Sequence, residues 1–123
     1  MRCRFVQPKI VRLVLTDSQW IDVKRELSYG EQIEMFAAMR KQYGPGTVPV
    51  LDTTAVGRAR MGAYLLGWSF VDAEGTPVPV SPAAINNLDL ETVREIATAL
   101  EVHDEAIAEE KKRLTAPVSA TNS

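Results

Sequence analysis

The chain has 123 residues, a formal net charge of −2 and one cysteine, which excludes an internal disulfide. Hydrophobic residues make up 46% of it and charged residues 24%, values typical of a folded globular protein. No apolar run approaches the roughly 20 residues of a membrane helix, and polar residues interrupt the N-terminal region where a signal peptide would need an apolar core. We therefore expect a cytoplasmic protein with one globular domain over residues 1–114 and a mobile tail over residues 115–123.

The start of the chain predicts a β-hairpin. Residues 10–15 (IVRLVL) are rich in aliphatic side chains, and residues 20–27 (WIDVKREL) alternate between two faces. Asp17 and Ser18, between these runs, can bond their own backbone and favour a reversal of the chain. The fold class that we predict is α+β and mainly helical, with this hairpin followed by three main helices and one short helical turn.

The first helix is predicted over residues 30–42. Ser28 and Glu31 have the spacing of a capping box, in which each side chain accepts a hydrogen bond from the other residue's backbone N–H. Glycine and proline in residues 43–49 (YGPGTVP) stop the helix. The apolar residues suited to one buried face are Ile33, Phe36, Ala37 and Met39.

The second helix is predicted from residue 52 to about residue 69, and it is apolar nearly all round. One side carries Val56, Ala59, Ala63, Leu66 and Phe70. The other side carries Met61, Tyr64, Leu65 and Trp68. Such a helix must be covered on two sides, either within its own domain or by a partner chain, and both arrangements stay open. Gly57, Gly62 and Gly67 suggest a close approach of neighbouring backbones.

The end of this helix either packs into the hydrophobic core or forms a binding loop. Trp68 and Phe70 are interpreted as core anchors, with a binding platform as the alternative. Residues 72–75 (DAEG) predict a turn, and residues 76–81 (TPVPVS) form at most an edge strand because proline lacks a backbone donor.

A helical turn and a long helix complete the predicted fold. Ser81 and Pro82 have the residue types of a helix cap and first position, and Asp89 caps a helix over residues 90–114. The apolar stripe of the long helix is interrupted by Asp104 and Lys111. It consists of Leu90, Val93, Ala97, Leu100, Ile107 and Leu114.

The charges are distributed unevenly along the chain. Residues 1–25 hold six basic side chains against two acids, whereas residues 89–110 hold eight acids against Arg94. These regions are either separate solvated faces or a basic and an acidic surface that join copies of the chain head to tail, so self-association stays open. Nucleic-acid binding by the basic residues, with Phe5 and Trp20 interleaved, is disfavoured by the acidic pI near 5.4.

The sequence contains no motif that predicts catalysis, and we expect no enzyme activity, no cofactor and no metal. The single cysteine and the single histidine stand 100 residues apart, which argues against a zinc site. No nucleophile-elbow, phosphate-loop or dinucleotide-binding pattern occurs. His103 is interpreted as a partly buried or surface residue of the long helix.

Two strings carry a resemblance to a known family. Residues 15–32 (LTDSQWIDVKRELSYGEQ) and residues 58–81 (RARMGAYLLGWSFVDAEGTPVPVS), followed by an acidic helix, resemble the small tail assembly chaperones of long-tailed bacteriophages, over about residues 10–113. The resemblance implies a non-enzymatic protein of the host cell cytoplasm that coats the tape measure protein and recruits tail tube subunits. The alternative is a structural virion component, such as a small head–tail connector or tail accessory protein.

Neither a nucleic acid nor a membrane is expected as a partner. The candidate residues for a protein interaction are Trp20, Arg58, Met61, Tyr64, Leu65, Trp68 and Phe70.

Overall fold

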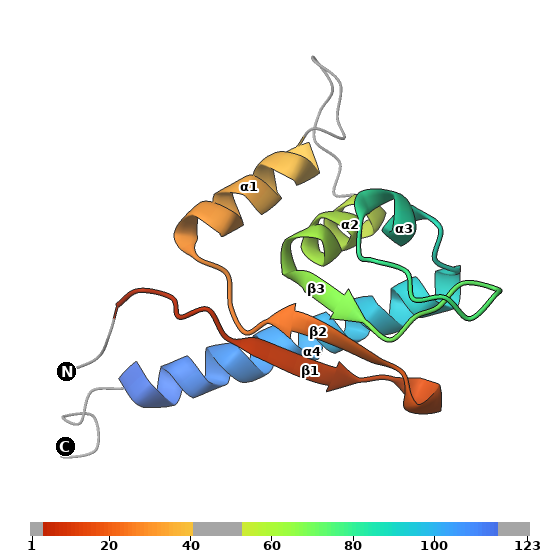
Figure 1. Ribbon diagram of the computed structural model, residues 1–123. Helices are drawn as coiled ribbons and strands as arrows, with labels where there is room; N and C mark the ends of the chain where they lie inside the picture. Colours follow the sequence, from red (N-terminus) through yellow and green to blue (C-terminus); the bar gives the residue numbers. More distant parts are fainter. Residues whose placement is uncertain (1–3, 41–52, 116–123) are drawn as a thin grey trace, which may run out of the picture.

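The computed structural model describes residues 4–40 and 53–115, so the predicted stop at residues 43–49 and all of the predicted tail except Thr115 lie outside the described residues. The fold is α+β and mainly helical, as predicted (Figure 1). An antiparallel sheet has the order β1-β2-β3 and consists of β1 (Ile10–Val14), β2 (Trp20–Lys24) and β3 (Leu65–Trp68). The helices are α1 (Tyr29–Arg40), α2 (Thr53–Tyr64), α3 (Pro82–Asn86) and α4 (Leu90–Thr115).

The predicted hairpin is confirmed. β1 and β2 pair in antiparallel register, and the Leu15 N–H donates to the Gln19 carbonyl at 2.8 Å to close the turn. Asp17 and Ser18 have left-handed φ values of 56° and 60°, which aspartate tolerates better than most residues. The Glu95 carboxylate of α4 accepts a 2.8 Å hydrogen bond from the Thr16 N–H, so the turn is fastened to the long helix.

The prediction for the second helix is wrong at its C-terminal end. α2 stops at Tyr64, and the next four residues form β3, which supplies backbone partners to the free side of β2. Val23 pairs with Leu65 and Asp22 with Gly67, so the register shifts by one residue at Leu66. This bulge puts Leu65 and Trp68, three positions apart, on the same buried face, a spacing that imitates a helix.

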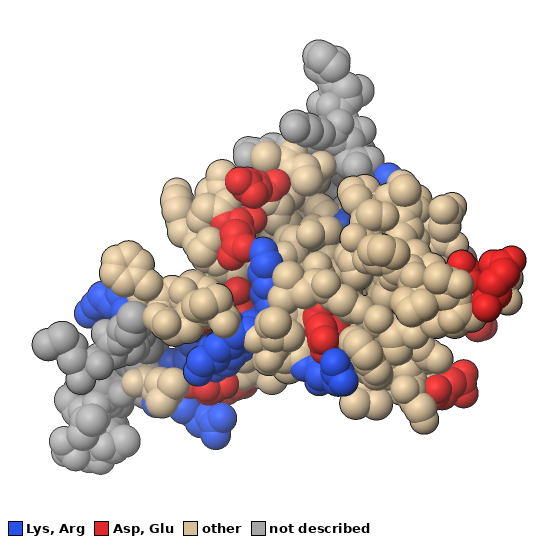
Figure 2. Space-filling model, viewed as in Figure 1, with Lys and Arg blue, Asp and Glu red and all other residues tan. Residues whose placement is uncertain are grey.

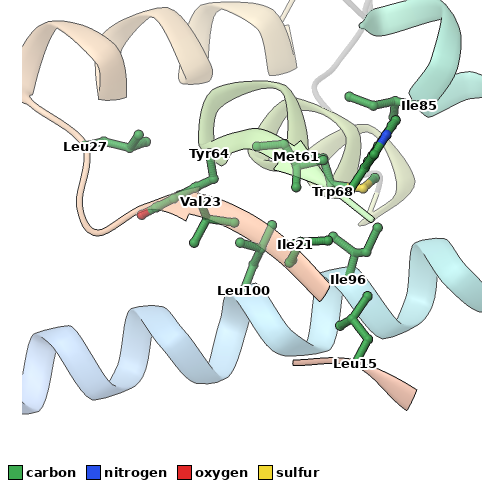
Figure 3. Close-up of a cluster of buried hydrophobic side chains, with 11 residues drawn as sticks. Leu15, Ile21, Val23, Leu27, Met61, Tyr64, Trp68, Ile85, Ile96 and Leu100 are labelled. Carbon is green, nitrogen blue, oxygen red and sulfur yellow. The ribbon is translucent and has the colours of Figure 1, made fainter. Parts of the chain in front are cut away.

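The core lies where one face of the sheet meets α4, α2 and α3 (Figure 3). The predicted stripe of α4 is rotated from the observed one, because the buried residues are Ile96, Leu100 and His103 while Leu90 and Leu114 are exposed. His103 can be buried because its Nε2 lies 2.7 Å from the Arg25 carbonyl oxygen, so this ring nitrogen has a hydrogen-bond partner. The histidine is therefore more buried than predicted.

The predicted caps of α3 and α4 are confirmed. The Ser81 hydroxyl accepts from the Ala84 N–H at 3.0 Å, and the Asp89 carboxylate accepts from the Thr92 N–H at 2.7 Å, which lowers the pKa of Asp89. Residues 72–75 form the expected turn, with Gly75 at a φ of 81°. Residues 76–81 form no strand and contribute only one isolated bridge to Val71.

Candidate protein-interaction surface

The structure divides the seven candidate residues into two groups. Four of them lie in the core, where little of each side chain is open to a partner: Met61, Tyr64, Leu65 and Trp68. Trp68 also donates its indole N–H to the Val78 carbonyl, and its ring packs on Phe70 with 5.1 Å between ring centroids. Phe70 is partly buried against the core, so both aromatic residues are core anchors as interpreted from the sequence.

Trp20 belongs to the open face of the sheet. The Arg12 guanidinium lies 3.6 Å from the Trp20 ring centroid and bonds both carboxylate oxygens of Asp22, at 2.9 and 3.1 Å. These bonds raise the pKa of Arg12 and lower the pKa of Asp22. In Figure 2, basic and acidic side chains lie beside one another on this side of the molecule, with wide uncharged areas around them.

Helix α1 exposes apolar side chains that the sequence assigns to a buried face. Figure 1 shows α1 standing apart from the sheet and from α4, and its packing within the described chain is mainly on α2. Ile33 and Phe36 are 45% and 47% exposed, while Met35 packs against the core cluster. The predicted face is therefore wrong for Ile33 and Phe36, although Ala37 and Met39 are partly buried. Among the described residues, one neighbouring helix leaves part of α1, which is apolar on several sides, uncovered.

The exposed residues of α1 form a continuous stripe. Tyr29, Ile33 and Phe36 have the spacing i, i+4 and i+7, which aligns them on one helix face, and Tyr29 is 82% exposed. We call these three residues the α1 stripe. Ile33 and Phe36 are visible in the sequence as apolar positions, but their spacing alone does not say whether the chain itself or another protein covers them.

A groove separates α1 from α2. It has a volume of about 350 Å³, and its apolar lining consists of Met35, Ala38, Ala59, Gly62 and Ala63. Arg58 lines it as well and extends into a second hollow, between α2 and α3, of about 280 Å³. A Cβ placed at Gly62 would meet nothing within 4 Å, so this glycine borders open space and the predicted close approach of a neighbouring backbone is wrong here.

The predicted close approach of a neighbouring backbone is also wrong at Gly57 and Gly67. A Cβ at Gly57 would also meet nothing within 4 Å. Gly67 lies in β3, not in a helix, and a Cβ there would make an ordinary 3.9 Å contact with the Asp22 side chain.

The capping box of α1 forms one end of the groove. Glu31 accepts from the Ser28 N–H at 2.9 Å, the Ser28 hydroxyl accepts from the Glu31 N–H at 3.2 Å, and Lys24 pairs with the same carboxylate. Two hydrogen bonds lower the pKa of Glu31. The bond from the Lys24 ammonium has the larger effect, and the bond from the Ser28 N–H has the smaller one. Lys24 and Glu31 also line a hollow of about 340 Å³ beside Ile10 and Leu66. The ion pair therefore links the first turn of α1 to the end of β2.

The basic N-terminal region and the acidic helix α4 meet within one chain. Arg25 bonds Glu110 at 2.6 Å, and Lys111 of α4 pairs with Glu26. The Arg25–Glu110 bond uses part of the opposite charge of the two regions, whereas Glu26 and Lys111 lie outside both, and self-association stays a prediction.

The described residues show no arrangement suited to metal chemistry. They contain no group of three or more His, Cys, Asp or Glu side chains that could hold a metal ion. None of the described helices is long and apolar enough to cross a membrane.

In comparisons with protein-family models, curated proteins and solved structures, nothing matches this chain.

Proposed function

We propose that the chain is a tail assembly chaperone of a long-tailed bacteriophage that binds the tape measure protein in the host cytoplasm, keeps its long apolar helix in solution and helps to recruit tail tube subunits. The chaperone acts through binding and not through catalysis. The observation that carries the proposal is the groove between α1 and α2, with the α1 stripe on the opposite face of the same helix as a second apolar surface.

The geometry suits an apolar helix as the ligand. A helix that lies in a hydrophobic groove inserts side chains at spacings of three and four residues, and the small floor residues Ala59, Gly62 and Ala63 allow its backbone to come close. Ile33 and Phe36 lie on the opposite face of α1, where a further segment of the tape measure protein would remove their apolar surface from water, at about 25 cal/mol per Å². Arg58 lines the groove, and Trp20 and Phe70 keep some exposed surface and stay candidates for contacts elsewhere with the partner.

The proposal is tested by co-expressing the chain with the tape measure protein encoded in the same genome region. We expect the chain to raise the soluble fraction of that protein and to co-purify with it. The double variant Ile33→Glu and Phe36→Glu should weaken both effects because it places two charges on the α1 stripe. A matched control is Val102→Glu, which adds a charge at an exposed apolar position of α4 and should keep both effects.

Two results would contradict the proposal. One is a tape measure protein whose solubility does not depend on the chain. The other is the chain as a stoichiometric part of purified virions, which would favour a head–tail connector or tail accessory protein.

A further inference from the structure

The outer edge of β1 has backbone groups that no described strand uses. In an antiparallel pair, residues that bond the neighbouring strand alternate with residues whose N–H and C=O groups point away. The Arg25 N–H donates to the Lys9 carbonyl at 2.9 Å, and the Leu15 N–H donates to Gln19, so odd-numbered residues of this segment face β2. The groups that point outward therefore belong to Ile10, Arg12 and Val14.

This edge lacks the usual protection against pairing with another strand. Natural edge strands are commonly short, bulged or charged. β1 is a regular strand of five residues, and Ile10 and Val14 are 66% and 78% exposed. Its one charged side chain, Arg12, lies over the sheet face, where it contacts Asp22 and Trp20, and not along the edge. The opposite edge is different, because β3 has four residues and a bulge.

The charge around β1 indicates what kind of strand fits. Residues 4–14 contain Arg4, Lys9 and Arg12 and no acidic residue. Asp22 already pairs with Arg12, and the acids Glu26 and Glu31 near Ile10 have basic partners of their own, so Lys9 at the start of β1 and Arg4 further along the segment are the basic side chains left for an acidic strand. A second copy of β1 would bring like charges together, whereas an acidic segment would complement them.

We propose that the outer edge of β1 binds an extended, acidic segment of a partner protein by strand addition. The segment bonds the outward backbone groups of Ile10, Arg12 and Val14. Its apolar side chains lie beside Ile10 and Val14, and its carboxylates meet Arg4 and Lys9. This site uses different residues from the groove between α1 and α2 and does not depend on the chaperone function.

The test uses two short capped peptides, one alternating valine and glutamate and the other alternating valine and lysine. Hydrogen exchange of the whole chain is followed by NMR. We expect the glutamate peptide to slow exchange at the amides of Ile10, Arg12 and Val14, less so at high salt, and the lysine peptide to have no such effect. Equal protection by both peptides, or none at these amides, overturns the proposal. Protection that grows with protein concentration without peptide overturns it in favour of a second copy.

A backbone variant tests the hydrogen bonds directly. Val14→Pro removes one outward N–H and leaves the donors to β2 in place, whereas the control Val14→Ala keeps that N–H. We expect the proline variant to bind the glutamate peptide about tenfold more weakly than the alanine variant. Ile10→Pro, compared with Ile10→Ala, gives the same test at the other end of β1 if circular dichroism shows that Val14→Pro is unfolded. Equal affinities within the folded pair overturn the proposal.

Discussion

The two sides of α2 differ in what covers them. Met61 and Tyr64 point into the core, where they pack with residues of α4 (Figure 3). Arg58 and Gly62 lie on the side that borders the groove toward α1. The sequence shows a helix that is apolar nearly all round, and the structure shows that the described chain fills only one side closely.

The difference separates residues that maintain the fold from residues available for binding. Close packing makes a buried side chain costly to remove, because its neighbours relax only partly into the cavity. A residue that borders open space contributes little to stability, so a surface of this kind can change without unfolding the protein. Variants on the two sides of α2 should therefore give opposite results in stability and binding experiments.

The largest effect is expected from Met61→Ala on the packed side. Met61 is only 2% exposed, and shortening a buried methionine to alanine lowers the free energy of unfolding by about 2–5 kcal/mol. Denaturant unfolding measures this loss. Met39→Ala is the matched control, because Met39 is partly exposed on α1, and it should cost clearly less. Equal losses for the two variants would mean that α1 is as tightly packed as the core.

A smaller effect is expected from Tyr64→Phe. The Tyr64 hydroxyl donates to the Asp104 carboxylate at 2.6 Å, and burial together with this bond raises the pKa of Tyr64. Loss of the bond should lower the free energy of unfolding by about 1–2 kcal/mol, the lower part of the range for bonds to charged groups, because water reaches the partly exposed Asp104. Tyr29→Phe, at an exposed position of α1, should change nothing measurable. A loss as large from Tyr29→Phe would show that α1 has an unrecognised polar contact.

Local sequence chemistry was sufficient for the hairpin and the caps. Ser28, Ser81 and Asp89 accept from backbone groups only a few residues away, and Asp17 takes a left-handed φ in the turn, so their roles can be predicted without knowing the rest of the fold. The two strands of the hairpin are adjacent in sequence, and the alternation of residues 20–24 identifies the buried face. These features need no information about distant residues.

The errors arise where a distant partner decides the outcome. Leu65–Trp68 becomes a strand because β2 has a free side, and the bulge at Leu66 hides the usual alternation of a strand. On α4, His103 is buried because the Arg25 carbonyl satisfies it, so a polar residue occupies a position that the apolar pattern assigns elsewhere. The predicted and the observed interaction residues differ for the same reason. Ile33 and Phe36 were predicted to be buried, and four of the proposed interaction residues lie in the core.

The smallest effect is expected on the open side of α2, from Gly62→Ala. Alanine is more favourable than glycine in a helix by about 0.5–1 kcal/mol, and the added methyl group would meet nothing within 4 Å. The free energy of unfolding should therefore rise by about that amount. Gly57→Ala makes the same change in the same helix, also into open space, but Gly57 is not among the residues that line the groove. Both variants should be slightly more stable than the natural chain.

Binding should distinguish the two alanine variants. A helix that packs closely on Ala59, Gly62 and Ala63 would be pushed outward by a methyl group at position 62, because closely packed interfaces do not absorb added volume. Gly62→Ala should therefore weaken the interaction with the tape measure protein while Gly57→Ala leaves it unchanged, as measured by co-purification and by titration of the purified complex. A variant that gains stability and loses binding cannot owe the loss to unfolding. If Gly62→Ala binds as well as Gly57→Ala, the groove floor does not contact the partner, and the α1 stripe alone would have to account for binding.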